Sequence, residues 1–135
     1  MASQTNSPLV LVIDDNPMNI KLMRGIMAFG GYALETALSA EEGLAKARQI
    51  EADIILMDLQ LPEMDGYQAT EILRNSEQYK ETPILAISGY AMGARETELL
   101  SAGFSGYLQK PITVQDVLAA LAQHLGTEPY RLPGV

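Results

Sequence analysis

Five short apolar runs, spread along almost the whole chain, constrain its fold more than any other feature. Four of them are dense in Val, Ile or Leu with little polar alternation, which is typical of strands buried on both faces of a parallel sheet. The run at 33–36 is the weakest. The runs are Leu9–Ile13, Ala33–Thr36, Asp53–Met57, Ile84–Ile87 and Phe104–Leu108. We therefore expect a parallel sheet of five strands.

Helix start signals lie in the intervals between these runs. Asn16 is a good helix cap, and Pro17 fits the first helical turn that follows it. Three more pairs have capping-box spacing: Ser39 with Glu42, Asp65 with Gln68, and Thr113 with Asp116. The helix after the fourth run has the least defined start, because Tyr90, Met92 and Gly93 blur it. The alternation of strands and helices predicts a doubly wound α/β domain with right-handed crossovers.

The chain fits one domain, because it has 135 residues of which 47% are hydrophobic. We expect tails at 1–8 and 126–135 and a globular domain at 9–125. The start of the chain lacks a signal-peptide pattern, and no stretch is long enough to span a membrane. The chain has no cysteine, which excludes disulfides and thiolate metal sites. These features favour a cytoplasmic protein, and the net charge of −8 argues against general nucleic-acid binding.

Carboxylates follow two of the predicted strands directly. Asp14 and Asp15 follow the first strand, and Asp58 follows the third. With strand order 2-1-3-4-5 these strands are neighbours at the switch point, where open parallel sheets bind their ligands. Three converging carboxylates raise one another's pKa, and a divalent cation removes that cost. Hard oxygen ligands without His or Cys favour Mg²⁺. Helix capping is an alternative role for Asp15, but it does not explain Asp58.

Two further polar residues are expected at the same edge of the sheet. Lys110 follows the fifth strand and offers a compact positive charge for phosphate oxygens. Ser88 follows the fourth strand and offers a hydroxyl group. Each residue alone would be an ordinary surface or strand-end residue. Together with the carboxylates they indicate a site that handles a phosphoryl group.

The chain resembles the receiver domains of two-component response regulators from about Leu9 to Leu125. The matching segments are Val12–Asn19, Ile55–Gly66, Ile84–Met92 and Ala102–Pro111, in this order and at this spacing. Two of them also resemble receivers of hybrid sensor kinases and of single-domain cell-division regulators. The resemblance implies a flavodoxin-like (βα)5 fold and a signalling module that catalyses only its own phosphorylation and dephosphorylation.

The resemblance also implies a role for each matching residue. Asp58 would be the phosphoacceptor, and Asp14, Asp15 and the backbone carbonyl of Gln60 would complete a site for Mg²⁺, with Mn²⁺ as a substitute. Ser88 and Lys110 would contact the phosphoryl group. Tyr107 would turn inward when Ser88 moves, and the Lys110–Pro111 peptide bond would be cis.

Some positions differ among family members. Ser88 replaces the commoner threonine, and Gly89 replaces a small alanine. Gln60 and Tyr90 lie where families differ in the lifetime of the aspartyl phosphate. For Tyr107, half-buried packing with the hydroxyl group in water is the alternative to a switch role.

Three other functions compete with this interpretation. A phosphohydrolase would commonly carry an acidic residue two positions after its nucleophile, where this chain has Gln60. A binding module that is never phosphorylated would have lost one of the site residues, and all are present. A flavin-binding module would need a Ser-, Thr- and Gly-rich loop in place of residues 14–17, which are Asp-Asp-Asn-Pro.

The expected partners are a sensor histidine kinase, a histidine phosphotransfer protein, or both. No partner nucleic acid and no membrane insertion are expected. The chain is expected to be a monomer or a weak dimer that forms on phosphorylation. The start at Met1 and the short tails favour a stand-alone module over a receiver fragment of a hybrid kinase.

Overall fold

The sheet has five parallel strands in the predicted order. The computed structural model describes residues 7–89 and 96–126, and within them the strand order is β2-β1-β3-β4-β5. The strands are β1 (Leu9–Ile13), β2 (Ala33–Ala37), β3 (Ile54–Asp58), β4 (Ile84–Ser88) and β5 (Gly106–Gln109). All neighbouring pairs are parallel. The prediction of a doubly wound (βα)5 domain is confirmed.

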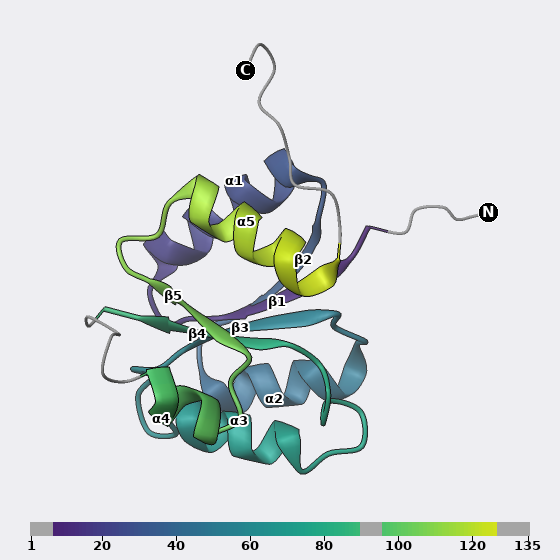
Figure 1. Ribbon diagram of the computed structural model, residues 1–135, viewed down its shortest axis with the longest axis vertical. Helices are drawn as coiled ribbons and strands as arrows, with labels where there is room; N and C mark the ends of the chain where they lie inside the picture. Colours follow the sequence, from purple (N-terminus) through teal and green to yellow (C-terminus); the bar gives the residue numbers. More distant parts are fainter. Residues whose placement is uncertain (1–6, 90–95, 127–135) are drawn as a thin grey trace, which may run out of the picture.

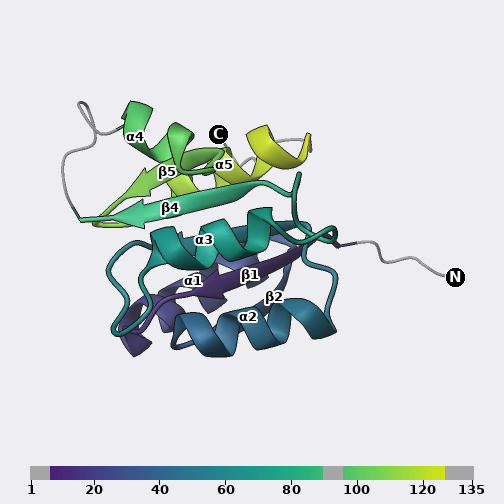
Figure 2. The ribbon, with the colours of Figure 1, turned by 90° about the horizontal axis from the view of Figure 1, so that it is seen from below.

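Helices cover both faces of the sheet. Their bounds are α1 (Pro17–Gly30), α2 (Ala40–Gln49), α3 (Gly66–Arg74), α4 (Glu96–Ser101) and α5 (Val114–Leu125). Helices α1 and α5 lie on one face, and α2, α3 and α4 lie on the other (Figures 1 and 2). The polar residues at the carboxyl ends of the strands therefore lie between two helical layers.

The expected helix caps are present. The side chain of Asn16 accepts from the Met18 N–H at 2.9 Å, with Pro17 as the first helical residue. Ser39 caps α2 by accepting from the Glu42 N–H, and Thr113 caps α5 by accepting from the Asp116 N–H. At α3 both hydrogen bonds of a capping box form between Asp65 and Gln68. These local contacts determine where each helix begins.

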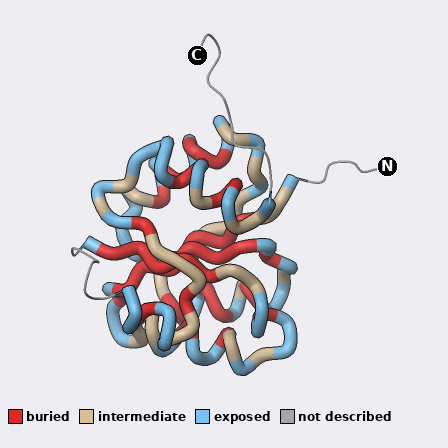
Figure 3. Tube along the Cα trace, in the orientation of Figure 1, coloured by how far each residue is buried: buried red, intermediate tan, exposed pale blue. Residues whose placement is uncertain are grey.

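Two apolar cores lie on opposite sides of the sheet. One lies under α1 and α5 and includes Val12, Leu56 and Ile87. The other lies under α2, α3 and α4 and includes Ile13, Met57 and Ala86. Every residue of β3 and β4 is buried, as Figure 3 shows along the centre of the sheet. Burial on both faces explains why these strands appear in the sequence as continuous apolar runs.

Two strands begin later than the sequence predicts, and the ends of the strands differ from the predicted runs by no more than one residue. The fifth run was placed at Phe104–Leu108, but β5 begins at Gly106. Phe104 is apolar because it packs edge-on against Tyr67 of α3, with ring centroids 5.8 Å apart. The third run was placed one residue early, because Asp53 lies before β3 and its side chain accepts from the Leu9 N–H.

The start of the helix after β4 was predicted to be blurred by Tyr90, Met92 and Gly93. These residues lie outside the described part of the chain, and α4 is first seen at Glu96. Within residues 7–89 and 96–126, no helix has both the length and the apolar character that a membrane crossing requires.

Candidate functional site

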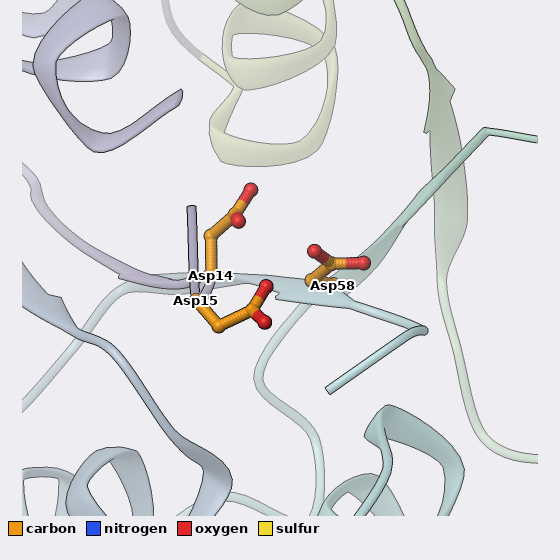
Figure 4. Close-up of side chains that lie close together, drawn as sticks. All are labelled: Asp14, Asp15 and Asp58. Carbon is orange, nitrogen blue, oxygen red and sulfur yellow. The ribbon is translucent and has the colours of Figure 1, made fainter. Parts of the chain in front are cut away.

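Three carboxylates meet at the carboxyl ends of β1 and β3. The register pairs Ile13 with Met57, so the residues that follow them, Asp14 and Asp58, are neighbours across the two strands. Asp14, Asp15 and Asp58 each offer an oxygen atom, and these atoms lie within 4.8 Å of one another. Figure 4 shows the three side chains side by side. Pairing between β1 and β3 thus brings together the acids that the sequence placed at two separate strand ends.

The three carboxylates differ in burial. Asp14 is 0% exposed and Asp58 is 2% exposed, whereas Asp15 is exposed. The backbone N–H of Asp14 continues the ladder to β2 by donating to the Ala37 carbonyl at 3.0 Å. This bond fixes the Asp14 backbone against one neighbouring strand while the side chain faces the other acids.

Burial raises the pKa of Asp14 to about 6, and the charge of Asp58 adds to this effect. Two donors act in the opposite direction. The Asn16 N–H donates to Oδ1 of Asp14 at 2.9 Å, and Nδ2 of Asn19 donates to Oδ2 at 3.1 Å. Both oxygens of Asp14 therefore have protein partners, whereas Asp15 faces solvent.

Asp58 has two partners in the described structure. Its Oδ2 lies 3.2 Å from Nζ of Lys110, and its Oδ1 accepts from the Gln60 N–H at 2.9 Å. The side chain of Lys110 is 27% exposed, so this ion pair is only partly shielded from water. Asp58 therefore lies between two acids and one base at the end of a buried strand.

Ser88 and Lys110 are held at the same edge by the pairing of β4 with β5. Ser88 is the last residue of β4 and is 2% exposed. The Lys110 N–H donates to the Ser88 carbonyl at 2.7 Å, and the Lys110–Pro111 peptide bond is cis. The structure thus places Ser88, Lys110 and Pro111 at the same end of the sheet as the three carboxylates.

Tyr107 lies on β5, away from the carboxylate cluster. It is half-buried, packs against the core under α2, α3 and α4, and lines a cavity of about 220 Å³ between α4 and α5. The switch role of Tyr107 and the metal-binding role of the Gln60 carbonyl remain predictions.

Two residues near the cluster were not singled out from the sequence. Asn19 hydrogen-bonds to Asp14 from one turn into α1, and Gly66 begins α3 directly against the Asp58 backbone. The signal for Asn19 was its place in the matching segment 12–19. Gly66 likewise ends the matching segment 55–66, but nothing local marks its contact with Asp58, which depends on how the loop after β3 returns.

The donor set fits a divalent cation of the Mg²⁺ type. The ligands are carboxylate oxygens, and the ion pair of Asp58 with Lys110 supplies one positive charge against three acids. Burial raises the pKa of Asp14 and the charge of Asp58 adds to this effect, so the ionised carboxylate is unfavourable here without a neighbouring cation. Oxygen donors without nitrogen or sulfur are those that Mg²⁺ prefers.

Known sequences match most of this chain. Residues 10–122 match the response regulator receiver domain family. The polar-differentiation response regulator DivK of Brucella ovis is 34% identical over 117 residues, which are 87% of this chain and 95% of DivK. The histidine-protein kinase BarA of Shigella flexneri is 38% identical over 103 residues, which are 76% of this chain and 11% of BarA.

Solved structures are similar over most of the chain. The chemotaxis response regulator CheY4 of Vibrio cholerae has a TM-score of 0.85 at 31% identity and covers 89% of this chain and 100% of its own. The receiver domain of the sensor histidine kinase PA1611 from Pseudomonas aeruginosa has a TM-score of 0.82 at 29% identity. The match covers 90% of this chain and 100% of the PA1611 receiver domain. That structure contains a magnesium ion in its active site cleft. The chain therefore belongs to the receiver domain family of two-component response regulators.

Proposed function

We propose that Asp58 accepts a phosphoryl group from a phosphohistidine on a sensor histidine kinase or a histidine phosphotransfer protein. The observation that carries this proposal is the position of Asp58 between two acids and Lys110 at the end of a buried strand. The chain is then a signalling module whose chemistry is limited to its own phosphorylation and dephosphorylation. It acts in the cytoplasm as the globular domain 9–125 between two tails.

In the transfer, an oxygen of the Asp58 carboxylate attacks the phosphorus atom and forms an acyl phosphate. The phosphorus–nitrogen bond to the imidazole breaks, and the imidazole nitrogen keeps the electron pair. Lys110 leaves its ion pair with the carboxylate and binds an oxygen of the phosphoryl group. Asp14, Asp15, Asp58 and the backbone carbonyl of Gln60 would hold Mg²⁺ or Mn²⁺. When bound, the cation neutralises charge on the phosphoryl oxygens.

The added phosphoryl charge biases the domain between two conformations. The hydroxyl group of Ser88 moves to donate to a phosphoryl oxygen. Tyr107 moves into the space that Ser88 leaves, and the face formed by α4, β5 and α5 changes shape. Phosphorylation then changes partner binding or allows onward transfer, as a population shift between two states. The unphosphorylated chain is monomeric, and any dimer forms weakly on phosphorylation.

The experiment is phosphorylation of the purified protein by acetyl phosphate in the presence of Mg²⁺. Mass spectrometry is expected to find one added phosphoryl group, localised to Asp58. This group should not be added when EDTA replaces Mg²⁺ in the reaction. Asp58→Asn should remove it. Asp65→Asn is the matched control, because asparagine caps α3 as well as aspartate does. A wild-type protein that stays unmodified, or labelling that survives Asp58→Asn, would refute the proposal.

A receiver that is part of a hybrid kinase is a second candidate, supported by the similarity to a segment of BarA. The chemistry at Asp58 is the same in both cases, but the donor differs. Phosphotransfer profiling against purified histidine kinases and phosphotransfer proteins identifies the preferred donor. A phosphorylation-independent binding module would bind its partner equally well as wild type and as Asp58→Asn.

A further inference from the structure

Helix α3 begins in direct contact with the backbone of the phosphoacceptor. A Cβ atom built on Gly66 would lie 2.4 Å from the carbonyl oxygen of Asp58. It would also lie 3.1 Å from the Cα atom of Leu59 and from Cγ of Met57. Carbon and oxygen atoms that are not bonded do not approach this closely. Two of these three neighbours are backbone atoms, so a change of rotamer cannot relieve the contact.

The conformation of Gly66 does not itself require glycine. In the described residues, the glycines with positive φ are Gly31, Gly103 and Gly126. Gly66 is a buried residue at the start of a regular helix. Glycine is among the poorest helix formers, because it loses the most backbone freedom on folding. The contact with Asp58 is therefore the feature of the structure that requires glycine here.

The start of α3 is held in place on both sides of this contact. The capping box joins Asp65 to Gln68, and the Gly66 N–H donates to the Leu59 carbonyl at 3.4 Å. The Leu59 N–H in turn donates to the Ile87 carbonyl of β4 at 3.1 Å. A side chain at position 66 would therefore press on Asp58 and Leu59, whose backbone is hydrogen-bonded to the sheet.

We infer that Gly66 is a positioning residue for Asp58. Without a side chain, it lets α3 pack against the Asp58 carbonyl while the carboxylate stays 3.2 Å from Lys110 and within 4.8 Å of the other acids. This inference rests on the proposed function, because it assigns Gly66 to the geometry of phosphoryl acceptance. Misplacing a reacting group by about 1 Å is enough to slow a reaction about a hundredfold.

The test compares Gly66→Ala with Gly30→Ala. A Cβ on Gly30 would lie 2.6 Å from Cδ2 of Leu118, so it meets the end of a flexible side chain between α1 and α5. Initial rates of phosphorylation by acetyl phosphate, Mg²⁺ affinity and thermal unfolding are measured for both variants. We expect Gly66→Ala to lose at least about tenfold in rate and to shift the amide resonances of Leu59 and Gln60. Gly30→Ala should keep the rate and the resonances and show only a change in unfolding midpoint.

A folded Gly66→Ala that is phosphorylated at the wild-type rate overturns the inference, and so does an equal loss of rate in Gly30→Ala. If Gly66→Ala unfolds under standard conditions, the rates are measured at low temperature with an osmolyte that favours the compact state. Failure to fold even there also overturns it, because glycine would then be required by the fold rather than by the site. Absence of phosphorylation in the wild type refutes the proposed function instead, so the two failures are distinguishable.

Discussion

Replacing Asp14 by asparagine should stabilise the metal-free protein. Asp14 is 0% exposed, and its pKa is raised from 3.8 to about 6. A folded-state pKa above the unfolded value means that the folded protein binds the proton more tightly. The stability from this proton is fully present below pH 3.8 and is lost as the pH rises through 6. At about 1.4 kcal/mol per pKa unit, the ionised carboxylate costs the folded state about 3 kcal/mol.

Asparagine removes this charge but does not recover the whole amount. The carbonyl oxygen of the new asparagine can still accept from the Asn16 N–H. Its NH₂ group takes the place of Oδ2, the acceptor of Asp14, so it faces Nδ2 of Asn19, which is also a donor. Losing that hydrogen bond costs about 1 kcal/mol. The net gain for Asp14→Asn at pH 7.5 is therefore about 1–2 kcal/mol, a rise of roughly 4–8 °C in unfolding temperature for a domain of this size.

The assay is thermal and urea unfolding in EDTA and again in millimolar Mg²⁺. A ligand that binds only the folded state stabilises it by RT ln(1 + [L]/Kd). The wild type should therefore gain stability from Mg²⁺, and Asp14→Asn should gain less, so that the two proteins converge or reverse their order. The advantage of Asp14→Asn in EDTA should also narrow as the pH falls through 6, because Asp14 is then protonated in the wild type.

Asp116→Asn is the control for net charge. Asp116 is exposed in the first turn of α5, and the chain has a net charge of −8, so both variants remove one negative charge from an acidic protein. This control should change stability by no more than about 0.5 kcal/mol. The reasoning fails if Asp14→Asn is no more stable than the wild type in EDTA at pH 7.5, or if Asp116→Asn gains as much.

Three further changes test other parts of the structure. Tyr67→Phe should raise the free energy of unfolding by about 1 kcal/mol, because the buried hydroxyl group of Tyr67 has no hydrogen-bond partner among residues 7–89 and 96–126; a loss measured by urea unfolding would contradict this. Arg74→Met should lower it by about 3 kcal/mol or more, because the guanidinium group donates to three backbone carbonyls and one hydroxyl group, whereas Lys80→Met at an exposed ion pair should change it little. Met18→Ser, at a side chain that is 69% exposed beside the site, should leave stability and phosphorylation by acetyl phosphate unchanged. Met18→Ser should slow phosphoryl transfer from a phosphohistidine protein. If the variant and the wild type accept the phosphoryl group from that donor at equal rates, the donor does not dock on the surface around Met18.

The strands and the main site residues could be predicted because their signals are local. A strand buried on both faces is a continuous apolar run, and the polar residue that ends the run marks the edge of the sheet. Asp58 and Ser88 were placed at strand ends by this reasoning alone, and each is the last residue of its strand. The helix caps were equally accessible, because each depends on residues two or three positions apart.

The features that could not be predicted depend on contacts between distant segments. Phe104 has the apolar character of a strand residue, but its partner is Tyr67 on α3. The different burial of Asp14 and Asp15 depends on how the chain returns after β1, because Asn16 and Asn19 contact the Asp14 side chain while Asp15 is exposed. The contact of Gly66 with Asp58 appears only when the path of the seven residues between them, 59–65, is known. In each case the local sequence is compatible with several arrangements, and the packing of two elements selects one.

The carboxylates of the site lower the stability of the metal-free fold, which explains how the domain can respond to a ligand. The apolar strands fix the positions of Asp14, Asp58 and Lys110, because each residue lies at or just after a strand end whose register is set by buried neighbours. That placement holds two buried carboxylates beside a third and raises the pKa of Asp14. A cation that engages these charges is then bound more favourably than it would be by solvated acids, since it relieves a cost that the fold already bears. The domain should consequently be most stable in its ligand-bound states, and a variant that relaxes the charge cluster should gain stability and lose that response together.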